Sequence, residues 1–126
     1  MRLGGSDVVK RVLVIDDEEN IRLLYKEELA DEGYEVSVAA SAQEALAKIE
    51  AERPDLITLD IRMPGVDGIE FLKLLRERDR DLPVIIVTAY GEYKQDFSVW
   101  ASDAYVVKSA DLDELKAMVR KILLPT

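Results

Sequence analysis

Five short apolar runs, each of a length that suits one β-strand, alternate with segments of helical periodicity along the chain. The first run, Arg11–Asp16, is apolar at consecutive positions, which is typical of a strand buried on both faces of a sheet. The others are Tyr34–Ala39, Asp55–Asp60, Pro83–Thr88 and Ala104–Lys108. This alternation restricts the possible folds, because consecutive parallel strands need a crossover segment, usually a helix, between them.

The segments between these runs contain residues that begin and end helices. From Glu19 to Glu32 apolar residues recur at helical spacing, and Gly33 follows where a C-cap is expected. The apolar positions of this segment are Ile21, Leu24, Tyr25 and Leu29. Further helices are expected from Ser41–Glu44, Asp67–Glu70 and Asp111–Glu114, with a short one between Glu92 and Ser102 that Phe97 and Trp100 suggest.

Alternating strands and helices predict an α/β fold in which helices cover both faces of a parallel sheet. Because right-handed crossovers leave few topologies, we predict a doubly wound five-stranded parallel sheet in the flavodoxin-like order 2-1-3-4-5. The 126 residues suit one domain, which we place at residues 10–126. Residues 1–9, which contain Gly4, Gly5 and Ser6, are expected to form a flexible leader.

Composition restricts the chemistry that this domain can perform. The net charge of −9 argues against direct binding to a nucleic-acid backbone. The absence of histidine and cysteine excludes a Ser-His-Asp triad, a thiolate nucleophile and an ordinary zinc site. No apolar run is long enough to cross a membrane and no signal-peptide pattern is present, so we expect a cytoplasmic location.

Polar residues stand where four of the five predicted strands end. These residues are Asp16 and Asp17 after the first strand, Asp60 after the third, Thr88 after the fourth and Lys108 after the fifth. The second strand, which is expected at an edge, ends in Ala39 and Ala40. Ligands of doubly wound sheets bind beyond the carboxyl ends of the strands, near the switch point between strands 1 and 3. Asp60 alone could simply begin a turn, but the pattern over four strands favours a binding site.

These residue types suit phosphoryl transfer. Three crowded carboxylates repel one another unless a cation is bound or a proton is taken up, and with oxygen ligands alone Mg²⁺ is the expected cation. Lys108 would neutralise a further oxygen, and Thr88 would donate a hydroxyl hydrogen bond. We therefore interpret Asp60 as a nucleophile that forms an aspartyl phosphate.

The same residues resemble the motifs of the receiver domain of bacterial two-component response regulators. These motifs are the Asp16–Asp17 pair, the run Asp60–Gly68, Thr88–Ala89 and Lys108, and the resemblance extends from about Arg11 to Leu124. It implies a receiver fold in which Asp60 accepts the phosphoryl group and Thr88 and Lys108 bind its oxygens. It also implies that Mg²⁺ is held by Asp16, Asp17, Asp60 and the backbone carbonyl of Arg62, and that Tyr105 turns inward with Thr88 during switching.

The resemblance also implies partners. The phosphoryl donor would be a phosphohistidine of a sensor histidine kinase or phosphotransfer protein. The switched domain would contact an unidentified downstream protein, without direct contact to nucleic acid or a membrane. The chain would catalyse only its own phosphorylation and dephosphorylation and would not be an enzyme in the usual sense. Ser109 stands where the family usually has proline, and the stretch from Thr88 to Lys108 is slightly shorter than usual. The sequence therefore leaves open whether this chain has the family's usual output face.

Two other functions stay open on the sequence alone. A haloacid-dehalogenase-like phosphatase also uses an aspartate nucleophile and Mg²⁺, but it has a second aspartate two residues further on, where this chain has Arg62. A receiver-like module that binds partners without phosphorylation is the other alternative, and Ser109 keeps it open. The sequence also leaves open whether the chain is a single-domain regulator or part of a larger one.

Overall fold

The computed structural model describes residues 9–60, 68–88, 103–109 and 111–124. Its strands are β1 (Arg11–Ile15), β2 (Glu35–Ala39), β3 (Leu56–Leu59), β4 (Val84–Thr88) and β5 (Ala104–Val107). Its helices are α1 (Glu19–Asp31), α2 (Ala42–Ala51), α3 (Gly68–Arg78) and α4 (Asp113–Leu123). The short helix expected between Glu92 and Ser102, including Phe97 and Trp100, lies outside the described residues.

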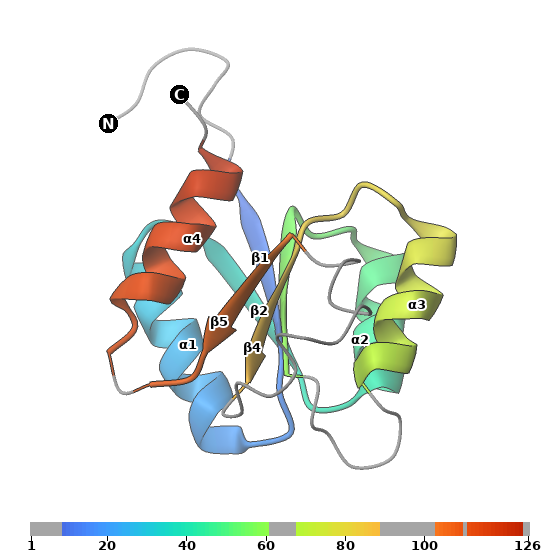
Figure 1. The fold of residues 1–126 in the computed structure, drawn as a ribbon, viewed down its shortest axis with the longest axis horizontal. Helices are drawn as coiled ribbons and strands as arrows, with labels where there is room; N and C mark the ends of the chain where they lie inside the picture. Colours follow the sequence, from blue (N-terminus) through green and yellow to red (C-terminus); the bar gives the residue numbers. More distant parts are fainter. Residues whose placement is uncertain (1–8, 61–67, 89–102, 110, 125–126) are drawn as a thin grey trace.

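The five strands form one parallel sheet in the order β2-β1-β3-β4-β5, which confirms the predicted topology (Figure 1). In the register of the central strands, Ile15 at the end of β1 lies opposite Ala39 of β2 and Leu59 of β3. These three strands therefore end level with one another. The residues that follow β1 and β3 in the chain consequently emerge side by side at one edge of the sheet.

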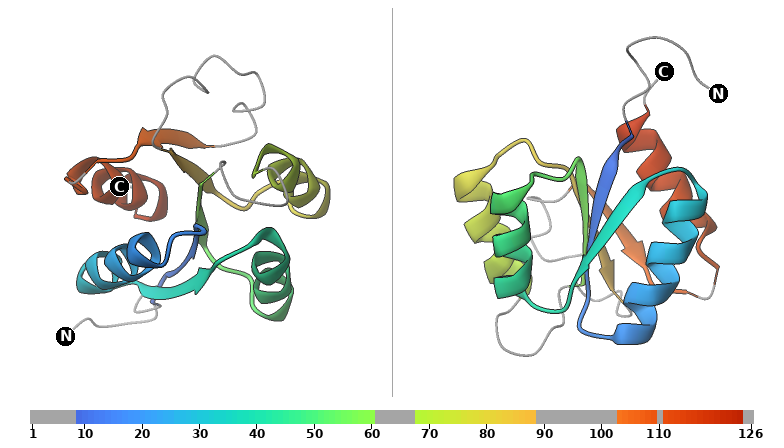
Figure 2. Two further views of the ribbon diagram at one scale, coloured as in Figure 1. Left: turned by 90° about the horizontal axis from the view of Figure 1, so that it is seen from below. Right: turned by 180° about the vertical axis from the view of Figure 1, so that it is seen from behind.

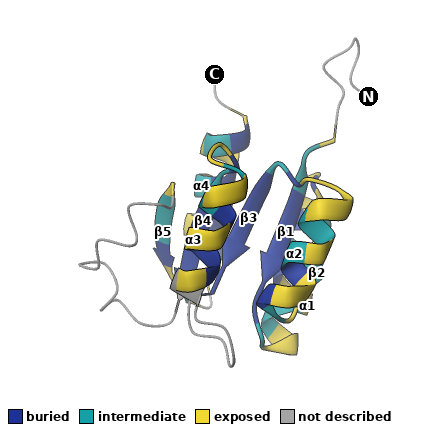
Figure 3. Ribbon diagram, turned by 90° about the vertical axis from the view of Figure 1, so that its right-hand side faces the viewer, coloured by how far each residue is buried: buried dark blue, intermediate teal, exposed yellow. Residues whose placement is uncertain are grey.

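Helices cover both faces of this sheet, with α1 and α4 on one side and α2 and α3 on the other (Figure 2). Along β1, Leu13 and Ile15 pack into the cluster that contains Phe71, whereas Val12 and Val14 pack into the opposite cluster. This alternation follows from the two-residue repeat of a strand. The central strands are accordingly buried on both sides (Figure 3), so their carboxyl ends are held by rigid backbone.

The end of α1 agrees with the prediction for Gly33, which has a φ of 101° in the left-handed region. Its backbone N–H donates to the Ala30 carbonyl at 2.9 Å, and that of Tyr34 donates to the Leu29 carbonyl at 3.3 Å. This pair of bonds is a Schellman motif, which satisfies carbonyls that the helix leaves unpaired. The motif ends α1 and turns the chain into β2.

Two details of the helices differ from the expectation. Leu24 of α1 is 38% exposed, so the face buried by this helix centres on Tyr25 and Leu29 and does not extend to Leu24. At the start of α2 the Ser41 hydroxyl accepts the Glu44 N–H at 3.1 Å, as a capping box requires. The Glu44 carboxylate, however, accepts the N–H of Ala40 at 2.6 Å, one residue before the cap.

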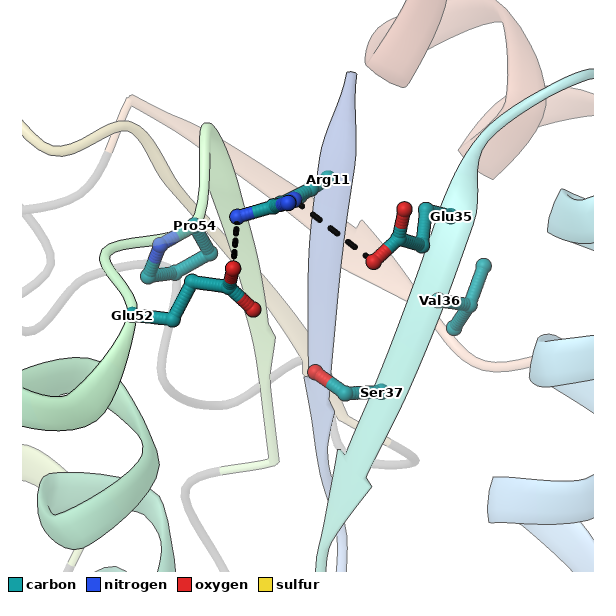
Figure 4. Close-up of a pocket in the computed structure, with 6 residues that line it drawn as sticks. All are labelled: Arg11, Glu35, Val36, Ser37, Glu52 and Pro54. Atoms are coloured by element: carbon teal, nitrogen blue, oxygen red, sulfur yellow. Dashed lines mark ion pairs between the residues drawn. The ribbon is translucent and has the colours of Figure 1, made fainter. Parts of the chain in front are cut away.

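At the amino-terminal edge of the sheet, Arg11 joins neighbouring elements through ion pairs (Figure 4). Its guanidinium contacts Glu35 of β2 at 3.6 Å and also contacts Glu52 at the end of α2. The hollow lined by these residues has a volume of about 60 Å³. The Arg11 guanidinium thus links β1 with β2 and with the end of α2, and the hollow lies at the sheet edge opposite the carboxyl ends of the strands. Among the described residues, no helix is long and apolar enough to span a bilayer.

Candidate functional site

The sheet brings two of the predicted carboxylates together at the ends of β1 and β3. The backbone N–H of Asp60 donates to the Ile15 carbonyl at 3.0 Å, and that of Asp16 donates to the Ala39 carbonyl at 3.1 Å. These bonds extend the sheet ladder by one residue beyond each strand. Asp16 and Asp60 are therefore positioned by rigid backbone, and both are buried, at 2% and 5% exposure.

Lys108, directly after β5, reaches both of these carboxylates. Its Nζ lies 2.8 Å from Oδ2 of Asp16 and 3.1 Å from Oδ2 of Asp60. Oε1 of Glu18 lies 3.8 Å from the same nitrogen. One cation thus links the ends of three strands, although Lys108 is 48 residues away in the sequence from Asp60, the nearer of the two aspartates. The lysine side chain is only 13% exposed, so water screens these attractions weakly.

Burial shifts the pKa values of residues in and beside this cluster of Lys108, Asp16 and Asp60. Burial by itself favours a lower pKa for Lys108, but the hydrogen bonds and negative charges of Asp16 and Asp60 outweigh it, so its pKa is raised. Burial raises the pKa of Asp16, because loss of hydration exceeds the opposing effect of the hydrogen bond from Lys108. Burial likewise raises the pKa of Tyr25, on α1, to about 12. A single lysine therefore does not fully offset the desolvation of the Asp16 carboxylate.

The acidic residues after β1 fit a hard divalent cation. Asp16, Asp17 and Glu18 each offer a carboxylate oxygen, and these oxygens lie within 4.8 Å of one another. Asp16 is buried, whereas Asp17 and Glu18 are more exposed, so the cluster is open to solvent on one side. Mg²⁺ prefers a few carboxylate oxygens together with several waters, and an open cluster leaves room for those waters. The residues present are thus suited to such an ion.

The other predicted site residues have different outcomes. Arg62 lies outside the described residues, and of Thr88 the structure describes only the backbone, as the last residue of β4. Tyr105 is half-buried and packs against the cluster between the sheet and α2 and α3. The Ser109 hydroxyl donates to the Asp111 carbonyl at 2.6 Å, and no peptide bond among the described residues is cis.

Two residues near the site were not predicted from the sequence. One is Glu18, whose only signal is its position directly after the aspartate pair. The other is Arg22 of α1, whose Nη1 donates to the backbone carbonyl of Asp16 at 2.8 Å. The Arg22 rotamer that makes this contact is set by tertiary packing and not by a local sequence pattern.

A sequence profile of the response regulator receiver domain family matches residues 12–120. The chain therefore belongs to the response regulator receiver domain family, a family of signalling modules in two-component systems. Its members accept a phosphoryl group, and the fold and strand-end residues described above agree with that role.

Particular relatives support this assignment. Sporulation initiation phosphotransferase F of Bacillus subtilis is 40% identical over 116 residues, which cover 90% of this chain and 94% of the relative. TrrA of Thermotoga maritima, solved in complex with Mg²⁺-BeF, is 50% identical with a TM-score of 0.88, over 91% of this chain and all of that one. The structure of histidine kinase ThkA in complex with TrrA gives 50% identity and a TM-score of 0.86, over 91% of this chain and 99% of that one.

Longer relatives contain further regions. The regulatory protein AtoC of Escherichia coli is 38% identical over 91% of this chain, but the match spans only 25% of AtoC. The transcriptional regulatory protein PhoP of Bacillus subtilis is matched over 48% of its length. The similarity to these proteins therefore concerns the receiver domain alone.

Proposed function

We propose that Asp60 is the phosphorylated residue of this receiver domain and that Asp16 and Asp17 hold Mg²⁺ beside it. The observation that supports this most directly is the position of Lys108, whose ammonium contacts the carboxylates of Asp16 and Asp60 together at the switch point of the sheet. Asp60 itself and the backbone carbonyl of Arg62 complete the proposed protein ligands. Mg²⁺, when bound, would neutralise oxygens of the phosphoryl group during transfer.

The chemistry of the chain's own residues follows from these positions. A carboxylate oxygen of Asp60 attacks phosphorus, and the bond between phosphorus and the donor nitrogen breaks as the donor imidazole keeps the electron pair. Lys108 exchanges part of its contact with Asp60 for a phosphoryl oxygen and thereby stabilises the added charge. We assign Thr88 to a second phosphoryl oxygen, and Tyr105 to the movement that follows it.

The proposed partner is a sensor histidine kinase or a phosphotransfer protein, because TrrA was solved in complex with the histidine kinase ThkA. A downstream protein, not nucleic acid or a membrane, would bind the switched surface. The receiver domain would comprise residues 10–126, a range that contains the segment 12–120 matched by the family profile. In this proposal the protein acts in the cytoplasm and modifies only itself.

The test is incubation of the chain with Mg²⁺ and acetyl phosphate, followed by intact mass measurement. We expect a single phosphoryl addition that is lost in the Asp60→Ala variant and in excess EDTA. Asp31→Ala, which changes an exposed aspartate on α1, is the matched control and should retain the addition. Addition that persists in Asp60→Ala would contradict the assignment. No addition to the wild type would instead favour a module that binds without phosphorylation.

A further inference from the structure

The acidic loop formed by Asp16, Asp17 and Glu18 is held by hydrogen bonds from the protein itself. The Asp16 N–H donates to the Ala39 carbonyl of β2 at 3.1 Å. The Glu18 N–H donates to Oδ1 of Asp16 at 2.9 Å. Nη1 of Arg22 donates to the backbone carbonyl of Asp16 at 2.8 Å. Backbone N–H groups donate the first two of these bonds. The third is donated by the side chain of Arg22, which lies outside the loop and is not a proposed ligand.

Arg22 is well placed for this contact because it is the fourth residue of α1. Side chains of a helix point back toward its amino terminus, so the Arg22 side chain extends over the first turn to the loop that precedes it. Its backbone N–H also donates to the Glu18 carbonyl at 3.1 Å, which anchors the residue to the same loop. Arg22 is a half-buried residue with a guanidinium that is always charged, and its hydrogen bond to a carbonyl is stronger than a neutral one.

The bond from Arg22 fixes the orientation of one peptide plane. The carbonyl of Asp16 belongs to the planar peptide unit that joins Asp16 to Asp17. Fixing this oxygen therefore restricts the direction in which the Asp17 side chain leaves the loop. Because the neighbouring carboxylates repel one another before a cation arrives, an unrestrained loop would let Asp17 turn away from the site.

We propose that Arg22 is a positioning residue of the cation site, which acts by holding the Asp16–Asp17 peptide so that the Asp17 carboxylate faces the ion. The inference rests on the magnesium site proposed above. Residues that orient metal ligands contribute about 10- to 100-fold to metal affinity. Since Arg22 restrains a ligand through a single backbone bond, we expect the lower end of this range.

Replacement of Arg22 by a neutral residue has two opposite effects on Mg²⁺ affinity, so the direction of the measured change tests the proposed role. Removal of a positive charge near a cation site should by itself strengthen cation binding, by about twofold at physiological salt. Loss of the peptide restraint should weaken it. Lys26 lies one turn further along α1 and is exposed, so Lys26→Gln provides the same change of charge as Arg22→Gln at a position away from the loop.

The experiment is a calorimetric titration of the full chain with MgCl₂. We expect Arg22→Gln to raise the dissociation constant for Mg²⁺ by about tenfold, Lys26→Gln to leave it unchanged or lower it, and Arg22→Lys to give an intermediate value. An unchanged or lower dissociation constant in Arg22→Gln would overturn the inference. So would a matching increase in Lys26→Gln, because the effect would then not depend on the loop contact.

Two further measurements separate this inference from the proposed function. Asp17→Asn should abolish Mg²⁺ binding, and if the wild type binds no Mg²⁺ or Asp17→Asn binds as well as the wild type, the cation site itself is wrong. If Asp17→Asn loses binding while Arg22→Gln keeps wild-type affinity, only the role of Arg22 is wrong. Thermal unfolding of each variant in EDTA checks the fold. A variant that is folded in EDTA and weak in Mg²⁺ binding supports a positioning role.

Discussion

Replacement of Lys108 by methionine should destabilise the metal-free protein, because it leaves two buried carboxylates without their shared cation. The Oδ2 atoms of Asp16 and Asp60 contact the same nitrogen at 2.8 and 3.1 Å, so they lie within about 6 Å of each other. At an effective dielectric constant of about 20, two negative charges at that distance repel by about 3 kcal/mol. Removal of one partner from a buried pair has a similar effect, about 3–5 kcal/mol.

The measurement is urea denaturation of wild type and Lys108→Met in EDTA at pH 7, where we expect the free energy of unfolding to fall by about 3 kcal/mol. The raised pKa of Lys108 means that its stabilising contribution is still present at pH 7 and, on the alkaline side, is lost only as the pH rises above 10.5 through the folded-state pKa. The difference between the two proteins should shrink toward pH 4, because protonation of one carboxyl removes the repulsion.

The control is Lys116→Met, which removes the lysine that pairs with Glu28 between α4 and α1 at 2.5 Å. This pair is near the surface, so its loss should change stability much less. Equal destabilisation in the two variants would refute the argument. A difference that persists unchanged at pH 4 would also refute it, since the effect would then not arise from the two carboxylates.

Two other predictions concern Gly33 and Tyr25. Gly33→Ala should lower the free energy of unfolding by about 1 kcal/mol. The φ of Gly33 is 101°, which strains an alanine, while the added Cβ would meet no atom within 4 Å. An unchanged urea midpoint would contradict the role of the Schellman motif. The pKa of Tyr25 is raised from 10.0 to about 12, so its contribution to stability is present below pH 10 and is lost as the pH rises toward 12. Over this pH range the unfolding free energy of wild type should therefore fall by about 2–3 kcal/mol more than that of Tyr25→Phe. The measurement is urea denaturation, with the phenolate absorbance as a second readout. If the unfolding free energies of the two proteins change with pH in parallel, the phenol is not buried as described.

Much of the fold follows from local patterns in the chain. Apolar runs such as Arg11–Asp16 specify buried strands, and the intervening helical periodicity requires parallel pairing. The capping residues Gly33 and Ser41 mark helix boundaries because their backbone preferences act over only a few residues. The exposure of Leu24 was not predictable in this way. It lies beside the apolar face of α1, and only the packing of that helix on the sheet decides where burial ends.

In the candidate site, too, some contacts could be predicted from the sequence and others depend on tertiary packing. The sequence alone determined that Asp16, Asp60 and Lys108 would meet, because carboxyl ends of neighbouring parallel strands emerge at one edge of a sheet. The contact between Glu18 and Lys108 and the bond from Arg22 to the Asp16 carbonyl were decided only by the tertiary structure. Both depend on how α1 is rotated against β1 and on the side-chain rotamers chosen there. These are set by the packing of residues such as Tyr25 and Leu29 against the sheet, which no local pattern in the sequence specifies.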